Sequence, residues 1–263
     1  MSDTAYPKFD GRARRVIDIR THNDSKVVAW LEDDFHCFGV VLHHDGQRVS
    51  DIHLSSNRYP FTTCSGAELP LKSLVGAPLE VRASAVGKWI DMRMQCTHAF
   101  DLAGLCLAQA AKNRADRRYE SVIEDRKIIE TLENGSRILG SGGAKLYMNK
   151  KVVLAWELHR NRIISPGAWK EQSLGKGFRE RTDNLEVELA EFATVLRRAV
   201  MVAGGRSGNR AAKVNPRDTS KPAVCHSYRE PQRAIARSIP ESLRNWQESS
   251  EGMLLNLVNE EKL

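Results

Sequence analysis

The sequence predicts an α+β fold with two antiparallel-sheet units, each followed by a long helix, and a further helix at the C-terminus. Short runs rich in β-branched and aromatic residues come before each long apolar stretch of helical spacing. The dipeptide Asp45-Gly46, which is typical of a tight hairpin, separates two of these runs. Both halves also follow one order of strands, Pro-containing loop, Gly turn and long helix, which indicates an internal duplication.

The first unit is expected over residues 15–116, after an N-terminal arm of residues 1–14. Val, Ile and Phe alternate or cluster in four short runs, as they do in strands that bury at least one face. A loop rich in Ser, Thr and Pro follows, and apolar residues then recur every three or four positions, which predicts helices. The expected strands are 15–20, 27–32, 35–44 and 47–55, and the expected helices are 69–75 and 97–114.

The second unit is expected over residues 117–205 and is a looser copy of the first. The expected strands are 118–123, 128–133, 144–148, 152–159 and 162–165, and the expected long helix is 184–203. Residues 206–222 are rich in Gly, Pro, Ser and Arg, which predicts a flexible basic loop. A returning strand and a helix over 240–261 complete residues 223–263. The apolar stripe of that helix is expected to pack on the body or on a second copy, giving a homodimer.

The composition indicates a soluble globular protein, because hydrophobic residues are 41% and charged residues 28% of the 263. No apolar run is long enough for a membrane span and no secretory signal is visible, so we expect a cytoplasmic protein with no membrane partner. The net charge is +7, but no zinc-finger, RNP-like or P-loop motif accompanies it, so we expect no nucleic-acid partner. The five cysteines are odd in number and include no CxxC pair, and in a cytoplasmic chain we expect them to stay reduced.

The first predicted hairpin carries several groups capable of chemistry. A two-residue turn at Asp45-Gly46 places Phe38 opposite His53 and His36 opposite Ser55. Because side chains alternate along a strand, His36, Phe38 and His53 would then share one face. Such a face can line a pocket, or it can be a solvated outer face that happens to carry histidines.

Five of the eight histidines fall between residues 36 and 98, which raises the question of a metal. Zinc sites commonly show His-x-His or His-x3–5-His spacing together with a carboxylate, and the chain has no such motif. We therefore predict no metal and no other cofactor, although a site assembled through space stays open.

The stretch MQCTHAFDL places a thiol, a hydroxyl and an imidazole where the long apolar helix begins. Thr97 is expected to cap that helix, with Asp101 in its first turn. Cys96 and His98 would sit at its positive end, which lowers a thiol pKa and attracts an anion. His98 is then placed for proton transfer. The alternative is a capped helix with a buried Cys and a His bonded to a backbone carbonyl.

The segment QCTHAF resembles the Gly-Cys-Thr-His-Leu signature of a bacterial family catalogued as a domain of unknown function, although Gln95 and Ala99 depart from it. Members of that family carry a His-Asp-Met-Trp strand and a Pro-Tyr…Cys loop upstream, where this chain has FHCF at 35–38 and RYPFTTC at 58–64. Longer members end with segments similar to VLRRA at 195–199 and CHSY at 225–228. The resemblance thus spans most of residues 12–240.

The resemblance implies a role in aromatic-compound catabolism, because longer relatives look like proteins of lignin-degrading bacteria. It implies a cofactor-independent lyase that removes a carboxyl or hydroxymethyl group from a phenolic dimer through a quinone methide. Such a site needs a base, an anchor for an anion and apolar walls for a ring. The catalytic candidates are His36, His53, His98 and Tyr59, and the candidates for binding the aromatic substrate are Cys96, Thr97, Arg58, Phe38, Phe61, Trp89 and Tyr228.

Two other functions remain open from the residues alone. The chain can be a non-catalytic protein that binds a small aromatic ligand. It can also be a hydrolase in which Cys96 acts with His98, although neighbouring positions at a helix start are poor geometry for a Cys–His pair.

Overall fold

A computed structural model describes residues 11–133, 136–207, 215–218, 225–255 and 257. The fold is mixed α/β with a large antiparallel sheet and several helices, as the sequence predicts at that level. The chain divides into two compact units, and each is assembled from segments distant in sequence. The larger unit comprises Val16–Tyr119, Val214–Leu243 and Glu251–Leu263, and the smaller comprises Met1–Arg15, Glu120–Lys213 and Arg244–Ser250.

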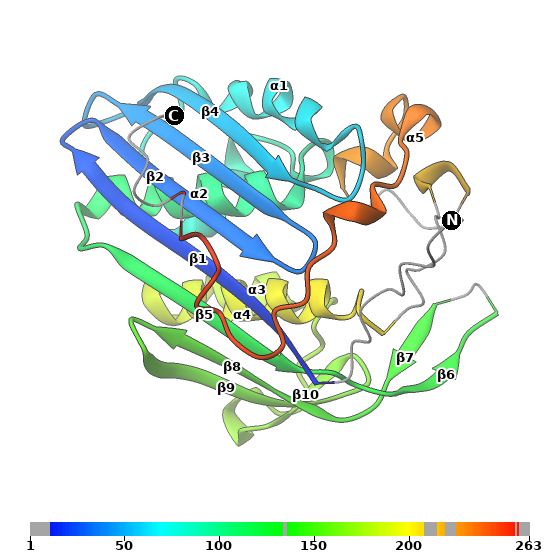
Figure 1. Cartoon of the computed structure of the whole chain (residues 1–263). Helices are drawn as coiled ribbons and strands as arrows, with labels where there is room; N and C mark the ends of the chain where they lie inside the picture. The colour runs from blue at the N-terminus through cyan, green and yellow to red at the C-terminus, as the bar shows by residue number, and fades with distance from the viewer. Residues whose placement is uncertain (1–10, 134–135, 208–214, 219–224, 256, 258–263) are drawn as a thin grey trace. The chain divides into compact units, whose positions relative to one another are not determined.

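Four strands build the sheet of the larger unit, and they are hydrogen-bonded neighbours in chain order (Figure 1). Val, Ile, Leu and aromatic residues fill these strands, and β2 and β3 are buried on both faces along nearly their whole length. The pairs β2–β3 and β3–β4 are antiparallel. The strands are β1 (Arg12–Asn23), β2 (Lys26–Asp33), β3 (Cys37–His44) and β4 (Val49–Arg58).

The register between β3 and β4 differs from the predicted one. His53 pairs with Val41, three residues along β3 from the predicted partner, Phe38. The two-residue turn is wrong because the Asp45 side chain builds a longer one: Asp45 Oδ1 accepts from the backbone N–H groups of Gln47 and Arg48 at 2.8 and 2.7 Å. This turn pairs His44 with Val49, which shifts the register by two residues, and a bulge between the His44–Val49 and His43–Asp51 pairs adds a third. The odd total moves His53 to the face opposite Phe38.

The long helix α2 (Thr97–Lys112) packs against β2 and β3 (Figure 1). The face of α2 that packs on the sheet is apolar and almost wholly buried. Val40 and Leu42 of β3 are fully buried as well. The helix also lies close to the 3-10 helix η3 (Ala83–Lys88). A Cβ at Gly104 would come within 2.3 Å of the Ala83 carbonyl oxygen, so only glycine permits this approach.

The larger unit also contains several short helices, and the predicted helix 69–75 appears as two of them. They are η1 (Cys64–Ala67), α1 (Glu68–Leu71), η2 (Lys72–Leu74), η4 (Met92–Met94), η6 (Pro216–Asp218), η7 (His226–Tyr228), α5 (Gln232–Ile235) and η8 (Pro240–Ser242).

In the smaller unit, the strand order is β5–β8–β9–β10 and the helix α4 packs on β8 and β9. Trp156, Trp169 and Phe178 fill its core, with ring centroids 5.2 to 6.1 Å apart. A separate two-stranded sheet joins β6 and β7. The elements are β5 (Arg117–Glu124), β6 (Ile128–Thr131), β7 (Arg137–Leu139), β8 (Gly142–Met148), β9 (Lys151–His159), β10 (Arg162–Ser165), η5 (Gly167–Trp169), α3 (Phe178–Asp183) and α4 (Val187–Ala203).

The predicted returning strand and C-terminal helix are wrong over the described residues. The segment after Cys225 begins with η7, and the only helical turn in the described part of 240–261 is η8. The apolar spacing suggested a helix, but Leu254 has a φ of +60° and docks as irregular chain, with its side chain buried beside that of Met253. Residues 1–10 of the predicted arm, and 208–214 and 219–222 of the predicted basic loop, lie outside the described residues, while Arg12–Arg14 belong to β1.

Among the described residues, no helix has both the length and the apolar character needed to cross a bilayer.

Candidate functional site

The turn between β2 and β3 joins a carboxylate to an imidazole. The Asp33 backbone N–H donates to His36 O at 2.9 Å and closes the turn. Asp33 Oδ1 accepts from the backbone N–H groups of Phe35 and His36, and it lies 2.9 Å from His36 Nδ1. A carboxylate at Nδ1 favours a proton on that nitrogen, which leaves the lone pair of the ring on Nε2. Asp33 therefore fixes both the turn and the orientation of the His36 ring.

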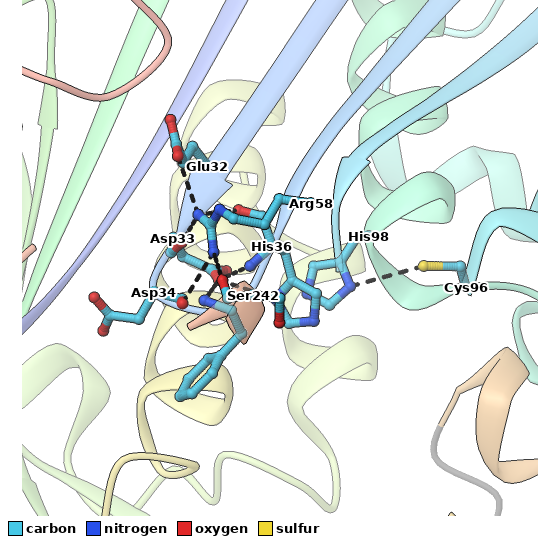
Figure 2. Close-up of polar contacts among 9 residues, drawn as sticks. Glu32, Asp33, Asp34, His36, Arg58, Cys96, His98 and Ser242 are labelled. Atoms are coloured by element: carbon cyan, nitrogen blue, oxygen red, sulfur yellow. Dashed lines mark hydrogen bonds and ion pairs between the residues drawn. The ribbon is translucent and has the colours of Figure 1, made fainter. Parts of the chain in front are cut away.

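The first turn of α2 brings a second imidazole to the same place. The His98 ring centroid lies 3.8 Å from that of His36, with the rings tilted by 33°. His98 also stacks almost parallel to Phe38, with the ring centroids 5.8 Å apart. Cys96 Sγ lies 3.7 Å from His98 Nδ1 (Figure 2). The structure thus unites three residues that the sequence singled out, His36, Phe38 and His98, with Cys96 beside them.

Arg58, the last residue of β4, is hydrogen-bonded to the turn between β2 and β3 (Figure 2). Its guanidinium pairs with Glu32 Oε1 at 3.0 Å, and both side chains are about nine-tenths buried. Its remaining bonds go to the backbone oxygens of Asp33, Asp34, His36 and Ser242. Arg58 therefore positions the Asp33–His36 turn, while its predicted role as a substrate anchor stays a prediction.

Glu32 extends this network to the C-terminal segment. Its Oε2 accepts a hydrogen bond from the Leu254 backbone N–H at 2.8 Å. Burial first, and then the Glu32 charge, raise the pKa of the neighbouring Cys37 thiol to about 12. This thiol is therefore protonated at neutral pH and adds no charge beside the ion pair.

The predicted activation of Cys96 at the helix start is wrong. Burial, with smaller contributions from Cys64 and Cys225, raises the pKa of the Cys96 thiol to about 12. Thr97 is the first residue of α2 and not its cap; the capping position is Cys96, whose side chain makes no capping bond. The first turn also contains no acidic residue, so Asp101 lies beyond it. Burial is therefore the largest influence on the pKa of this thiol.

We predict that Cys96 is inert toward alkylation in the folded protein. Because only the thiolate reacts, a buried thiol with a raised pKa should resist iodoacetamide at neutral pH. Mass spectrometry of peptides after labelling should find Cys96 modified in urea and unmodified without it. The half-buried Cys225 serves as the internal comparison. Rapid labelling of native Cys96 would restore the Cys–His hydrolase as a candidate.

The structure separates His53 from this cluster. His53 Nε2 lies 2.8 Å from Asp51 and its Nδ1 lies 3.2 Å from Glu68, with half of its side chain exposed. Lys72 bonds the same Asp51 at 2.7 Å. That bond, with one from the Ile52 backbone N–H, lowers the Asp51 pKa to about 2. The group is a solvent-exposed charge network, which corresponds to the solvated face that the sequence left open.

The other predicted substrate-binding residues lie in various places. Phe61 and Tyr228 contact each other edge to face, with centroids 5.5 Å apart. Tyr59 follows β4 and is half-buried. Trp89 is 45% exposed at the end of η3. The roles of these four rings in substrate binding or catalysis stay predictions.

Sequence reasoning missed Asp33, although a signal was present. Asp33 and His36 stand three residues apart between two predicted strands, and an Asp there readily accepts backbone N–H groups in a turn. With His98, they form the group of potential metal ligands found among the described residues, each offering one atom within 4.8 Å of the others. The cluster can therefore transfer protons or hold an ion.

Comparison with protein-family models and with curated proteins finds no match for the chain.

Proposed function

We propose that the protein is a carbon–carbon lyase that acts without a cofactor on a phenolic, lignin-derived aromatic dimer. The observation that supports the reaction type is the Asp33–His36 pair, held at 2.9 Å beside the His98 ring. A carboxylate that orients an imidazole is a common device for a general base. The resemblance of the Cys-Thr-His segment supplies the substrate class.

In the proposed reaction, His36 Nε2 takes the phenol proton of the substrate. The electron pair moves through the ring and expels the oxygen at the para benzylic carbon, which forms a quinone methide. Loss of carbon dioxide from a carboxylate, or of formaldehyde from a deprotonated hydroxymethyl group, then returns an electron pair. The ring regains its aromaticity, a stilbene double bond remains, and the expelled oxygen receives a proton.

Each residue of the cluster has a separate task in this proposal. Asp33 positions His36, and His98 exchanges protons with the departing oxygen or the side chain. The two imidazole rings lie in contact, so both can serve one bound substrate. Phe38, stacked on His98, offers an apolar surface for an aromatic ring.

Three broader expectations also stay proposals. They are that the protein works in the cytoplasm, that two copies form a homodimer, and that the two sheet-plus-helix halves arose by duplication. Sedimentation velocity on the full chain measures the oligomeric state directly.

The function is tested with purified, chelator-treated protein and a panel of phenylcoumaran-type acids and alcohols. We expect a stilbene product together with carbon dioxide from an acid or formaldehyde from an alcohol. If ligands of this class bind with no product, the alternative function as an aromatic-ligand binding protein replaces the lyase. If none binds, both proposals fail.

A further inference from the structure

Asp33, His36 and His98 form a compact cluster of one carboxylate and two imidazoles. The side chains of Asp33 and His36 are 4% and 12% exposed, and His98 is also buried. One nitrogen or oxygen from each lies within 4.8 Å of the other two. We propose that this cluster binds one divalent transition-metal ion of the zinc type.

The donor atoms select this class of ion. Two imidazole nitrogens and one carboxylate oxygen are a ligand set that Zn²⁺ and neighbouring first-row ions take in proteins. Mg²⁺ and Ca²⁺ prefer oxygen ligands alone, so two imidazoles disfavour them. Three protein ligands also leave a coordination position for water or a substrate oxygen.

The distances suit a shared ion after a small adjustment. Two ligands with bonds of about 2.0–2.2 Å to one tetrahedral ion lie about 3.3–3.6 Å apart. Asp33 Oδ1 and His36 Nδ1, at 2.9 Å, are already close to that spacing. The widest separation in the group, at most 4.8 Å, must shorten, and a rotation about one imidazole side chain can achieve this.

The surroundings hold the three ligands in place. Two backbone N–H groups fix the Asp33 carboxylate, and stacking against Phe38 orients His98 on a rigid helix. The Arg58 charge behind the turn opposes a cation, but the buried Glu32 partner offsets it. Local repulsion is thus balanced, and Asp33 contributes the charge that attracts the ion.

This inference goes beyond the proposed function, because it concerns binding with no substrate present. The two proposals place different demands on His36. The lyase needs its lone pair for a proton, whereas an ion uses a ring nitrogen as a ligand. Lyase assays on chelator-treated and zinc-loaded protein therefore show which form turns over, and a failed assay leaves the measured binding untouched.

The experiment uses the full chain, without a polyhistidine tag and stripped by a chelator. Calorimetry with Zn²⁺ should show one ion per chain, and Co²⁺ should give visible absorption bands typical of nitrogen and oxygen ligation. The substitutions His36→Gln and His98→Gln should each weaken binding about tenfold or more. Asp33→Asn keeps an oxygen for the turn but removes the charge, and it should also weaken binding.

The matched control is His53→Gln, which alters the exposed imidazole beside Asp51 and Glu68 and should leave affinity unchanged. Circular dichroism shows whether each variant folds. Should a variant unfold, NMR of the His ring signals in the unsubstituted protein identifies the ligands without any mutation. The proposal is overturned if Zn²⁺ does not bind saturably, or if binding follows His53 and not His36 and His98.

Discussion

His36→Ala should lower kcat of the proposed lyase by about 100- to 10,000-fold, the usual loss when a general base is removed. The reason is geometric, since His36 is the imidazole whose orientation the Asp33 carboxylate sets at 2.9 Å. His36 precedes β3, so its side chain contributes little to the stability of the sheet. Steady-state assays on the substrate panel measure kcat and KM, and thermal unfolding measures the stability of the same sample.

Asp33→Asn provides the corresponding test of positioning. An amide oxygen can still accept the two backbone N–H groups, but it no longer carries the charge that favours a protonated His36 Nδ1. We expect kcat to fall with little change in KM, and the pH profile of kcat to move. His53→Ala is the control, because its imidazole belongs to the exposed network of Asp51 and Glu68. Equal loss of activity in His53→Ala and His36→Ala would contradict the assignment of the base.

Arg58→Met should destabilise the protein by about 3–5 kcal/mol, the usual cost of leaving one member of a buried ion pair without the other. Both side chains of the Arg58–Glu32 pair are about nine-tenths buried, so solvent screens the interaction little. The substitution also removes donors to four backbone oxygens around the Asp33–His36 turn. Urea unfolding monitored by fluorescence gives the free energy of unfolding.

Two further variants separate burial from charge in this prediction. Lys88→Met breaks an ion pair with Glu80 in which the lysine side chain is 60% exposed. This substitution should lower the free energy of unfolding by less than about 1 kcal/mol. Adding Glu32→Gln to Arg58→Met removes the uncompensated charge and should restore part of the stability. Similar losses for Arg58→Met and Lys88→Met would show that the buried network contributes little.

Most of the secondary structure was predictable because its signals are local. The run of Phe, Val and Leu residues between positions 35 and 44 predicted β3, and the recurring apolar residues after Thr97 predicted α2 almost to its last residue. The same rule applied to the apolar stripe of residues 240–261 predicted a helix that the described residues do not form. There, Leu254 bonds to Glu32 in the distant strand β2, and this tertiary contact overrides helical spacing.

The register of one hairpin decided which predicted site residues meet. The longer turn held by the Asp45 side chain shifted β4 by two residues, and the bulge beside His43 and His44 added a third, which moved His53 to the other face of the sheet. The choice between a two-residue turn and this longer one depends on a few hydrogen bonds that the dipeptide Asp-Gly does not specify. The position of His36 does not depend on this register, because His36 lies before β3 and its ring is oriented by Asp33.

By itself, the sequence determined most of the strands and the two long helices, and that His36, Phe38 and His98 are candidates for one site. Only the tertiary structure decided that Asp33 joins them, that Arg58 and Glu32 support the turn, and that Cys96 is a buried, protonated thiol. The physical reason is that periodicity reports which side of an element is apolar. Hydrogen-bond partners and desolvation instead depend on residues distant in the chain, which no local pattern encodes.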